Sequence, residues 1–463
     1  MKTNFRDFVM EITSWSPVNF YKNNWIISVY PNTKKVKITI NNKYQELRDS
    51  LVWNIKSIQL PNLFENMSLL FKEVWLPNTL SFFQNENCDY ASPCLWSKNS
   101  YLSFWVIWWC ENVLYSYSVK DKSVDILNSV MIRDNCSIVY DSIWVFRSYK
   151  IFSSDNILDS NNIYNSSNLQ WCSFCINCNN LTNQSYFINN KSISKEEYDL
   201  YNKNTLWIYN KLKSNFLIKS ENIDKWFLSY QVKNSRNIGM CWSAEWNENL
   251  YDTYFFWSPS GNDVYAVMGW WSWLQYWYCS HLINGWSFVF YSIYLESCSF
   301  CLGCIWLKNK SYCILNKQYT KEERYEKVDE IFGQMDSDGT LGEFFPARMN
   351  PFYFNDTAAY LIDPSFTKEE VTAKWYLWRD EPIKVDIPET AQVISIHDLG
   401  QYESFDDAGV RKIDASILKK VIQDHQGNVY TIQWLEYNFL IKHGLPLPRK
   451  HWLDRMKENF RIS

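Results

Sequence analysis

Two cysteine triads are the groups in this sequence whose type and spacing could do chemistry. Both have the spacing C-x2-C-x2-C, and they are Cys172, Cys175 and Cys178 in the first triad and Cys298, Cys301 and Cys304 in the second. Thiolates at this spacing can hold zinc or an iron–sulfur cluster, for which a fourth ligand is needed. Cys313 or His281 could complete one such site.

The same triads also have a structural interpretation. Neighbouring members are three residues apart, which on a regular strand would place them on opposite faces unless a corner intervenes. Free cysteine behaves as a small apolar side chain, so the triads can fill the narrow corners of a repeat fold. The sequence favours this interpretation. It predicts no resident cofactor, with zinc bound by the triads as the alternative.

Other patterns nominate no catalytic residue. The segment Gly239-Met-Cys241-Trp242-Ser243 would resemble a nucleophile turn only if Trp242 were glycine. Carbohydrate cleavage needs two facing carboxylates, and the acids of the repeat region are scattered at Asp155, Asp159, Glu245 and Asp263. Dinucleotide-binding, P-loop and HExxH motifs are absent from the sequence. The sequence therefore favours a protein that is not an enzyme.

Composition and charge argue against several classes of protein. The 463 residues carry 46 Lys and Arg against 50 Asp and Glu, and this net charge of −4 does not support a nucleic-acid binder or a polybasic membrane anchor. No run reaches the roughly 18 apolar residues of a membrane span, and the N-terminus shows no apolar export signal. We expect a cytoplasmic protein whose 13 cysteines are reduced.

Tryptophan is over-represented in this chain and glycine is scarce. There are 25 Trp and 12 Gly, whereas average usage of about 7% would give roughly 30 Gly. Several Trp stand in turn-like segments, such as Trp270-Trp271-Ser272-Trp273 and Asn284-Gly285-Trp286, where glycine would supply a positive φ. Some bacteria read UGA as glycine, and translating such a gene with UGA as tryptophan would give this pattern. The alternative is a true aromatic binding surface.

The elements that would position the triads are mainly β. From about residue 85, short apolar patches alternate with Asn, Ser, Asp and Cys, and the surroundings of the first triad recur around the second, which predicts stacked repeats. Before them, Ile26 to Gln45 predicts a hairpin and Leu60 to Trp75 a helix. Capping boxes of the form Ser/Thr-x-x-Glu predict helix starts at Ser194, Thr320 and Thr367.

We predict a β-solenoid in two repeat halves, with a small α+β unit before it and a small α+β, ribbon-like module after it. The predicted divisions are an N-terminal unit (1–84), a first solenoid half (85–193), a helical insertion (194–224), a second solenoid half (225–318), a helix with an irregular connector (319–410) and the C-terminal module (411–463). In the last module, Leu418 to Tyr430 predicts strand, turn and strand, and two helices follow. The basic residues near the C-terminus could contact phosphates or form a solvated helix face.

Several segments resemble a known family. They are Asn85 to Tyr90, Ile314 to Glu323, Gly342 to Pro346, Asn350 to Phe352 with Asn355 to Thr357, and Leu445 to His451. In these segments the chain is similar to uncharacterised, Cys-rich repeat proteins of candidate-phylum bacteria, some of which read UGA as glycine. The resemblance implies a repeat region flanked by zinc-ribbon-like Cys pairs, and no established activity. Because Val421 to Asn428 and His451 to Arg455 lack those cysteines, we expect degenerate ribbons at the ends.

Together these patterns favour a scaffold or binding protein. We expect it to present its repeat surface to a protein or polymer partner, without chemistry. The alternatives are a metal-binding protein that uses the two triads, and a carbohydrate-binding or carbohydrate-cleaving solenoid. Solenoids host unrelated functions, so the fold alone cannot choose among these hypotheses.

Overall fold

The chain divides into two compact units, Met1–Thr79 with Ile218–Glu381 and Leu80–Leu217 with Pro382–Ser463. The structure, a computed structural model, describes residues 5–23, 26–31, 36–40, 61–79, 81–82, 84–205, 250–251, 261–268, 274–281, 288–381, 387, 391–407 and 409–460. In these ranges no helix has the length and apolar character needed to cross a membrane.

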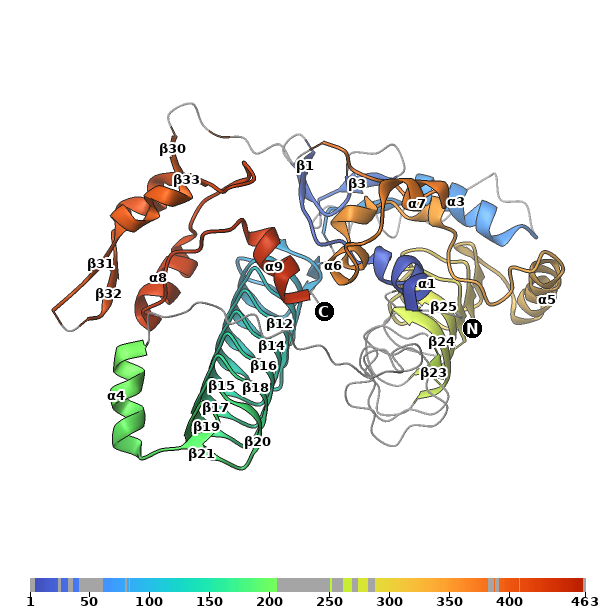
Figure 1. Cartoon of the computed structure of the whole chain (residues 1–463). Coiled ribbons are helices and arrows are strands. Elements are labelled where there is room, and N and C mark those ends of the chain that lie inside the picture. The colour runs from blue at the N-terminus through green and yellow to red at the C-terminus, as the bar shows by residue number, and fades with distance from the viewer. Residues whose placement is uncertain are drawn as a thin grey trace. The chain divides into compact units, whose positions relative to one another are not determined.

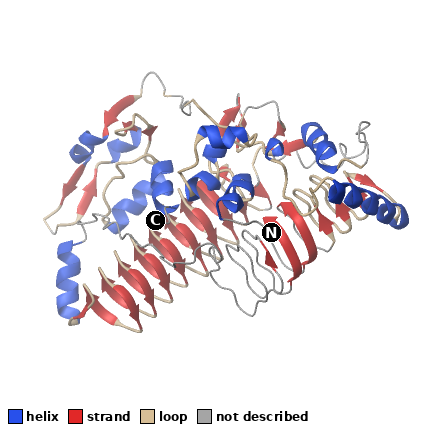
Figure 2. Ribbon diagram, turned by 45° about the vertical axis from the view of Figure 1, so that its right-hand side comes forward, coloured by secondary structure: helices blue, strands red, loops and turns tan. Residues whose placement is uncertain are grey.

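The first solenoid lies in the second unit and consists of two parallel sheets (Figures 1 and 2). One sheet contains β5 (Ser81–Phe82), β7 (Cys94–Leu95), the end of β8 (Lys98–Ile107), β10 (Tyr117–Lys120), β12 (Val130–Arg133), β14 (Ile143–Phe146), β16 (Asp155–Leu158), β18 (Ser167–Gln170) and β20 (Asn179–Thr182). The other contains β6 (Tyr90–Ala91), the start of β8, β9 (Glu111–Leu114), β11 (Val124–Leu127), β13 (Ser137–Tyr140), β15 (Tyr149–Phe152), β17 (Asn161–Tyr164), β19 (Ser173–Ile176), β21 (Ser185–Ile188) and the antiparallel β22 (Lys191–Ser192). From β9 to β21, successive strands alternate between the sheets, so each strand pairs with the strand two places further along. Strand β8 contributes to both sheets and pairs with β6, β7, β9 and β10.

A left-handed residue at every third position shapes these short strands. In the most regular part, φ lies between 49° and 53° at Asn156, Asp159, Asn162, Asn165 and Asn168. Asn and Asp tolerate this conformation better than other residues that carry a Cβ. Each left-handed residue interrupts the two-residue alternation of a strand, and as a result side chains three positions apart face the same interior.

That interior is a column of apolar side chains shared by all the coils. Ile151 pairs with Ile163 on the next strand of its sheet, and Ile163 pairs with Cys175; all three side chains are fully buried. Burying one such aliphatic side chain contributes about 1.5–3 kcal/mol. Because every coil obtains this burial from its neighbours, the solenoid is stabilised as a stack and not coil by coil.

Helix α4 (Lys195–Thr205) begins at the predicted capping box, at the end of the first solenoid. The Ser194 Oγ accepts the Glu197 N–H at 3.1 Å, and the Glu197 carboxylate accepts the Ser194 N–H at 2.9 Å. The Tyr198 ring is buried against the edges of Phe174 and Tyr186, at centroid distances of 5.7 and 5.9 Å. The rest of the predicted insertion, residues 206–224, lies outside the described residues.

The C-terminal module packs on the same solenoid. Its strands are β30 (Gln392–Ser395), β33 (Lys420–Gln423) and β34 (Val429–Tyr430) in one sheet and β31 (Glu403–Phe405) and β32 (Arg411–Ile413) in a hairpin, with 3₁₀ turns at Ile396–Tyr402 and Ala415–Lys419. The predicted strand–turn–strand and the two predicted helices, α8 (Trp434–His443) and α9 (Trp452–Phe460), are present. Phe439 of α8 stacks on Tyr140 at 6.1 Å, and Phe460 of α9 meets Tyr117 edge-on at 4.8 Å.

The second solenoid belongs to the first unit. Its parallel strands are β23 (Leu250–Tyr251), β24 (Gly261–Met268), β25 (Leu274–His281), β26 (Val289–Phe290), β27 (Cys301–Leu302) and β28 (Cys313–Ile314), followed by the antiparallel β29 (Lys317–Gln318). Helix α5 (Lys321–Ser337) begins with a complete capping box of Thr320 and Glu323. Arg324 then donates from Nε to the Phe300 carbonyl at 2.9 Å, which ties the helix to a solenoid coil.

The N-terminal segment packs against the segment that follows α5. The first contributes α1 (Phe5–Glu11), a 3₁₀ turn (Thr13–Trp15), β1 (Tyr21–Asn23), β2 (Ile26–Ser28), β3 (Lys37–Thr39), α3 (Leu63–Glu73) and β4 (Trp75–Pro77); the second contributes turns at Ala347–Met349 and Phe354–Asp356, α6 (Ala358–Ile362) and α7 (Lys368–Ala373). Trp15 is buried beside Phe345 at 5.3 Å, and the buried Asp356 accepts Arg379 Nε at 2.6 Å. The predicted helix over Leu60 to Trp75 is present as α3. The two runs of the predicted hairpin have other partners, since β2 pairs with β1 and β3 with β4.

Many of the described tryptophans occupy left-handed backbone. They are Trp96, Trp105, Trp108, Trp109, Trp144, Trp171, Trp306 and Trp375, with φ between 46° and 71°. Left-handed backbone costs an ordinary L-residue about 1–2 kcal/mol. Glycine takes up the same region at Gly303 (φ 64°), where a Cβ would lie 2.6 Å from the Leu63 side chain, and at Gly444 (φ 67°), which ends α8.

Candidate functional site

The triad cysteines lie inside the solenoids. In the first triad, Cys172 and Cys178 stand in two buried ladders made mostly of serine, whereas Cys175 belongs to the apolar column of Ile151 and Ile163. In the first solenoid one ladder contains Ser97, Cys110, Ser123, Cys136, Ser148, Ser160 and Cys172, and the other contains Ser103, Ser116, Ser129, Ser142, Ser154, Ser166 and Cys178. A typical rung is Ser154, whose Oγ donates to the Phe152 carbonyl at 2.8 Å and accepts the Ser166 N–H of the next coil at 3.1 Å. Each rung therefore joins two coils.

Cysteine takes the place of serine in this pattern. The Cys178 thiol donates to the carbonyl two residues earlier at 3.2 Å, and its N–H donates to Ser166 Oγ at 2.9 Å. Cys172, Cys175 and Cys178 are all buried in one core cluster. Corners intervene between neighbouring triad members, as the alternation argument allowed. Phe174 and Asn177 are left-handed, so the three cysteine side chains face the same interior.

The second triad is buried in the same way in the other solenoid. The Cys304 N–H donates to Ser292 Oγ at 3.1 Å, and Cys304 Sγ accepts the Asn316 N–H at 3.4 Å. Hydrogen bonds with Cys298, Cys304 and Cys313, followed by burial, raise the pKa of the Cys301 thiol well above its ordinary value. The Cys301 thiol is thus held in its neutral form.

The thiols of the first triad also interact with one another. A hydrogen bond with Cys178, followed by burial, raises the pKa of Cys175, and the same hydrogen bond lowers the pKa of Cys178. Even so, no three His, Cys, Asp or Glu side chains in the described part of the chain are placed to hold one metal ion. In this geometry each thiol of the first triad donates a hydrogen bond to a backbone carbonyl, as the serine hydroxyls do elsewhere in the ladders.

Asparagine forms a second kind of ladder on the outside of the first solenoid. Asn156 Nδ2 donates to Asn168 Oδ1 at 2.9 Å, and Asn168 donates in turn to Asn180. Another pair, Asn165 and Asn177, is joined at 2.7 Å. Because neighbouring strands of a sheet are about 4.8 Å apart, these amides recur at that interval. The left-handed backbone selects the residue, and the coil repeat places the amides in line.

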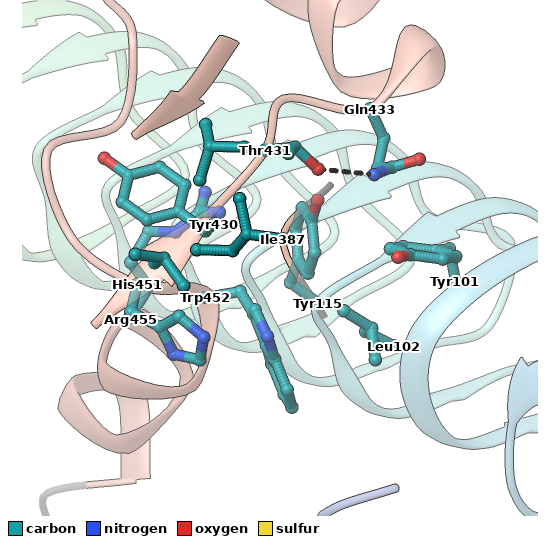
Figure 3. Close-up of a pocket in the computed structure, with 12 residues that line it drawn as sticks. Tyr101, Leu102, Tyr115, Ile387, Tyr430, Thr431, Gln433, His451, Trp452 and Arg455 are labelled. Atoms are coloured by element: carbon teal, nitrogen blue, oxygen red, sulfur yellow. Dashed lines mark hydrogen bonds between the residues drawn. The ribbon is translucent and has the colours of Figure 1, made fainter. Parts of the chain in front are cut away.

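A pocket of about 220 Å³ opens between the C-terminal module and the first coils of its solenoid (Figure 3). Its walls come from β8, the residue after β9, β33, β34 and the start of each C-terminal helix. The lining residues are Tyr101, Leu102, Tyr115, Ile387, Val421, Val429, Tyr430, Thr431, Gln433, His451, Trp452 and Arg455. The pocket therefore combines several aromatic rings with a few polar groups.

A buried ion pair lies beside this pocket. Arg455 Nη1 donates to Glu436 Oε1 at 2.9 Å, and their side chains are only 9% and 0% exposed. Burial opposes the charge of Arg455, but Glu436 together with Tyr115 and Tyr140 raises the pKa of the guanidinium. The guanidinium carbon also lies 4.7 Å from the centre of the Tyr115 ring. The two charges compensate each other, so the pocket carries no net charge from this pair.

The remaining titratable groups of the pocket are neutral near pH 7. Burial and the nearby Arg455 lower the pKa of His451 to about 4, and burial raises the pKa of Tyr101 to about 12. His451 Nδ1 accepts the Leu453 N–H at 3.3 Å, which assigns the ring hydrogen to Nε2. Gln433 Nε2 donates to Thr431 Oγ1 at 3.1 Å, as Figure 3 shows.

Three of the six basic residues near the C-terminus have acidic partners, Arg449 is exposed, and Arg461 lies outside the described residues. Arg455 is buried with Glu436, Lys450 pairs with Glu458, and Lys442 lies 3.8 Å from Asp125 of the solenoid. Helix α9 buries an apolar face against the solenoid. Of the other sequence candidates, Cys241 and Glu245 lie outside the described residues.

Sequence reasoning identified the triads but none of the pocket. Two signals could have found more. Residues 142–166 repeat the hexapeptide Ser-x-x-Ile/Val-x-x, which fixes the ladder positions. Trp452, Met456 and Phe460 recur at helical spacing, which marks the docking face of α9. Neither signal tells which solenoid residues that face would meet.

No family model, curated protein or solved structure matches this chain. The resemblance to Cys-rich repeat proteins thus stays a prediction, and function has to be argued from the geometry described above.

Proposed function

We propose that this protein is a non-catalytic binding protein whose first solenoid presents its asparagine ladders to an uncharged, polar polymer. The observation that carries this proposal is the row Asn156, Asn168 and Asn180, joined amide to amide on the outer surface. An Asn amide has two N–H donors and a carbonyl with two lone pairs. A middle amide uses one donor and one lone pair within the row, and it keeps the others for a ligand that repeats along its own length.

The chemistry-bearing side chains of the same solenoid support a binding role. The Ser154 hydroxyl and the Cys178 thiol face the interior and bind backbone carbonyls. Of the acids considered for carbohydrate cleavage, Asp159 forms an ion pair with Arg147 at 2.7 Å, which lowers the pKa of that carboxyl. Because this carboxylate stays ionised in its ion pair, it holds two coils together on the surface and is not suited to donate a proton.

Retention on insoluble polysaccharides tests the proposal. The intact chain is incubated with the uncharged polymers cellulose and chitin, and with peptidoglycan as a charged comparison, and the bound fraction is measured after a salt wash. We expect one polymer to retain the chain, and the triple variant Asn156→Gly, Asn168→Gly, Asn180→Gly to be released, because glycine keeps the left-handed backbone and removes the amides. Asn135→Gly, at an exposed left-handed position outside the ladder (φ 61°), is the matched control. Equal retention of the triple variant, or no retention at all, would refute the proposal.

We also propose that the tryptophans on left-handed backbone are glycines in the natural protein. Within the coils every third residue is left-handed whatever its type, so the backbone support comes from Trp375. Trp375 has φ 71° at the end of α7, the position that Gly444 occupies after α8. If these tryptophans are glycines, the exposed Trp109 and Trp171 take no part in the binding surface. Reading the gene at these codons, with peptide masses of the native protein, decides the matter: UGG codons and tryptophan masses would contradict it.

Zinc held by the triads is the second candidate function. The observation that favours it is that Cys301 interacts with Cys298, Cys304 and Cys313, although the described side chains are not arranged around one metal position. Metal analysis of protein purified without chelator provides the test. Stoichiometric zinc, together with a fall in the melting temperature on adding EDTA, would establish a metal role. Metal-free, folded protein would leave the thiols as ladder rungs.

A further inference from the structure

The pocket beside Arg455 has features that select one kind of ligand. Its volume of about 220 Å³ corresponds to roughly seven waters of the bulk liquid, which is the scale of a single substituted ring. The Tyr115 and Trp452 rings, 2% and 9% exposed, form its floor. Tyr101 and His451 are half-buried and form its sides, and Thr431 and Gln433 stand at its rim (Figure 3).

The spacing of the floor rings argues against a flat heterocycle held between them. Tyr115 and Trp452 are nearly parallel, with an interplanar angle of 22° and centroids 6.3 Å apart. A ring inserted between two others needs about 7 Å, which is two carbon–carbon contacts of roughly 3.5 Å. The two buried floor rings therefore leave no space for a ligand between them. Tyr101, which is half-buried, is the aromatic side chain that a ligand can lie against.

The polar groups of the pocket are neutral and offer both donors and acceptors. Gln433 donates one N–H to Thr431 and keeps the other N–H and its carbonyl. His451 directs its acceptor nitrogen to the Leu453 N–H, so its other nitrogen is a donor. The charge of Arg455 is compensated by Glu436. Such a set suits a ligand with several hydroxyl groups and no net charge, since an ionic ligand would find no opposite charge available.

We propose that this pocket binds a single neutral pyranose ring, either a free sugar or one residue of a glycan. One face of the ring would lie against Tyr101, above the buried floor, and its hydroxyl groups would bind Gln433, Thr431 and His451. The inference rests on the proposed function, because it names the building block of the polymer that the solenoid would bind. Trp452 is outside the group of tryptophans with positive φ among the described residues, so the backbone argument for glycine does not extend to this floor ring.

Saturation-transfer NMR on the intact chain tests the pocket. The probes are the methyl glycosides of glucose, galactose, mannose and N-acetylglucosamine, at millimolar concentration, with adenosine as the flat-ring comparison. We expect transfer to the ring protons of one glycoside. The variant Gln433→Met should weaken that binding about threefold to tenfold, the effect of removing one hydrogen bond. Tyr101→Leu should weaken it further, and Gln401→Met, at an exposed glutamine in the same module, should leave it unchanged.

Several results would overturn the inference. They are the absence of transfer to every glycoside, equal binding by Gln433→Met, and stronger binding of adenosine than of any glycoside. Near-ultraviolet circular dichroism of each variant separates loss of binding from loss of folding. The two proposals fail separately. If the chain is retained on a polymer but binds no glycoside, only the pocket proposal is refuted. If the triple asparagine variant keeps both glycoside binding and polymer retention, only the ladder proposal is refuted.

Discussion

Replacing Trp375 by glycine should stabilise the protein at the end of helix α7. Trp375 is 78% exposed and has φ 71°. Its N–H donates to the Thr372 carbonyl at 3.0 Å, and the next N–H, of Tyr376, donates to the Val371 carbonyl at 3.3 Å. This is the Schellman arrangement, in which the residue at Trp375 is usually glycine.

The size of the effect follows from two opposing contributions. Left-handed backbone costs a residue with a Cβ about 1–2 kcal/mol, whereas glycine adds about 0.4–1 kcal/mol of entropy to the unfolded chain. The exposed indole contributes little burial, so the balance is a gain of about 1 kcal/mol. A gain of that size should slow hydrogen exchange of the α7 amides about fivefold when exchange proceeds by local unfolding.

Helix α8 provides the reciprocal experiment. Gly444 ends α8 with φ 67°, and a Cβ at that position would meet no atom within 4 Å. Gly444→Ala therefore isolates the backbone cost and should speed exchange in the last turn of α8 by a similar factor. Mass spectrometry of peptides from both helices measures the two effects. If Trp375→Gly speeds exchange in α7 while Gly444→Ala behaves as expected, the backbone argument for the tryptophans is wrong.

Three further predictions concern the second unit. Ser154→Ala leaves the buried Ser166 N–H without its acceptor and should lower the free energy of unfolding, measured in urea, by about 1–3 kcal/mol. Ser154→Cys, which copies the thiol of Cys178, should lower it less. An equal decrease in both variants would contradict the role of the ladder. Arg455→Met leaves Glu436 charged and buried, which should destabilise the module by about 3–5 kcal/mol; limited proteolysis should then release α9, and the double variant with Glu436→Gln should recover most of the loss. The pKa of His451 in the folded protein is about 4, below the ordinary 6.5 of the unfolded chain. As the pH drops below 6.5 the unfolded chain therefore takes up the proton first, and the free energy of unfolding should fall by about 2 kcal/mol at pH 5. Thermal melts of His451→Gln should lack this contribution.

Local chemistry allowed much of the fold to be predicted. The boxes at Ser194 and Thr320 begin helices as expected, because both partners of a capping box lie within one turn of chain. The box at Thr367 is half formed: its hydroxyl accepts the Glu370 N–H, but the Glu370 carboxylate binds Arg6 at 2.6 Å instead. A partner more than three hundred residues away in sequence cannot be seen in a local pattern.

The strand pairs and the pocket also depend on partners that are distant in sequence and that a local pattern cannot predict. The run at Lys37–Thr39 has strand character, yet its partner is Trp75–Pro77, beyond helix α3, and not the nearer run. The floor of the pocket brings Tyr115 of the first coils against Trp452 of the last helix. The burial of the triads could be predicted from the sequence. Their common orientation could not, because it depends on left-handed residues at the corners, and few residue types indicate that conformation.

The serine and cysteine rungs have a consequence for how this protein can change in length. In the ladder from Ser103 to Cys178, each serine rung makes the same two bonds. Its Oγ donates to the carbonyl two residues earlier in its coil and accepts the N–H of the next rung, 12 or 13 residues further on. Removing a whole coil therefore reconnects equivalent partners, whereas removing a few residues breaks the register of both ladders at once. Such a rod can lengthen or shorten by duplication of its unit, about 4.8 Å at a time, while its cross-section and its outer row of amides stay the same.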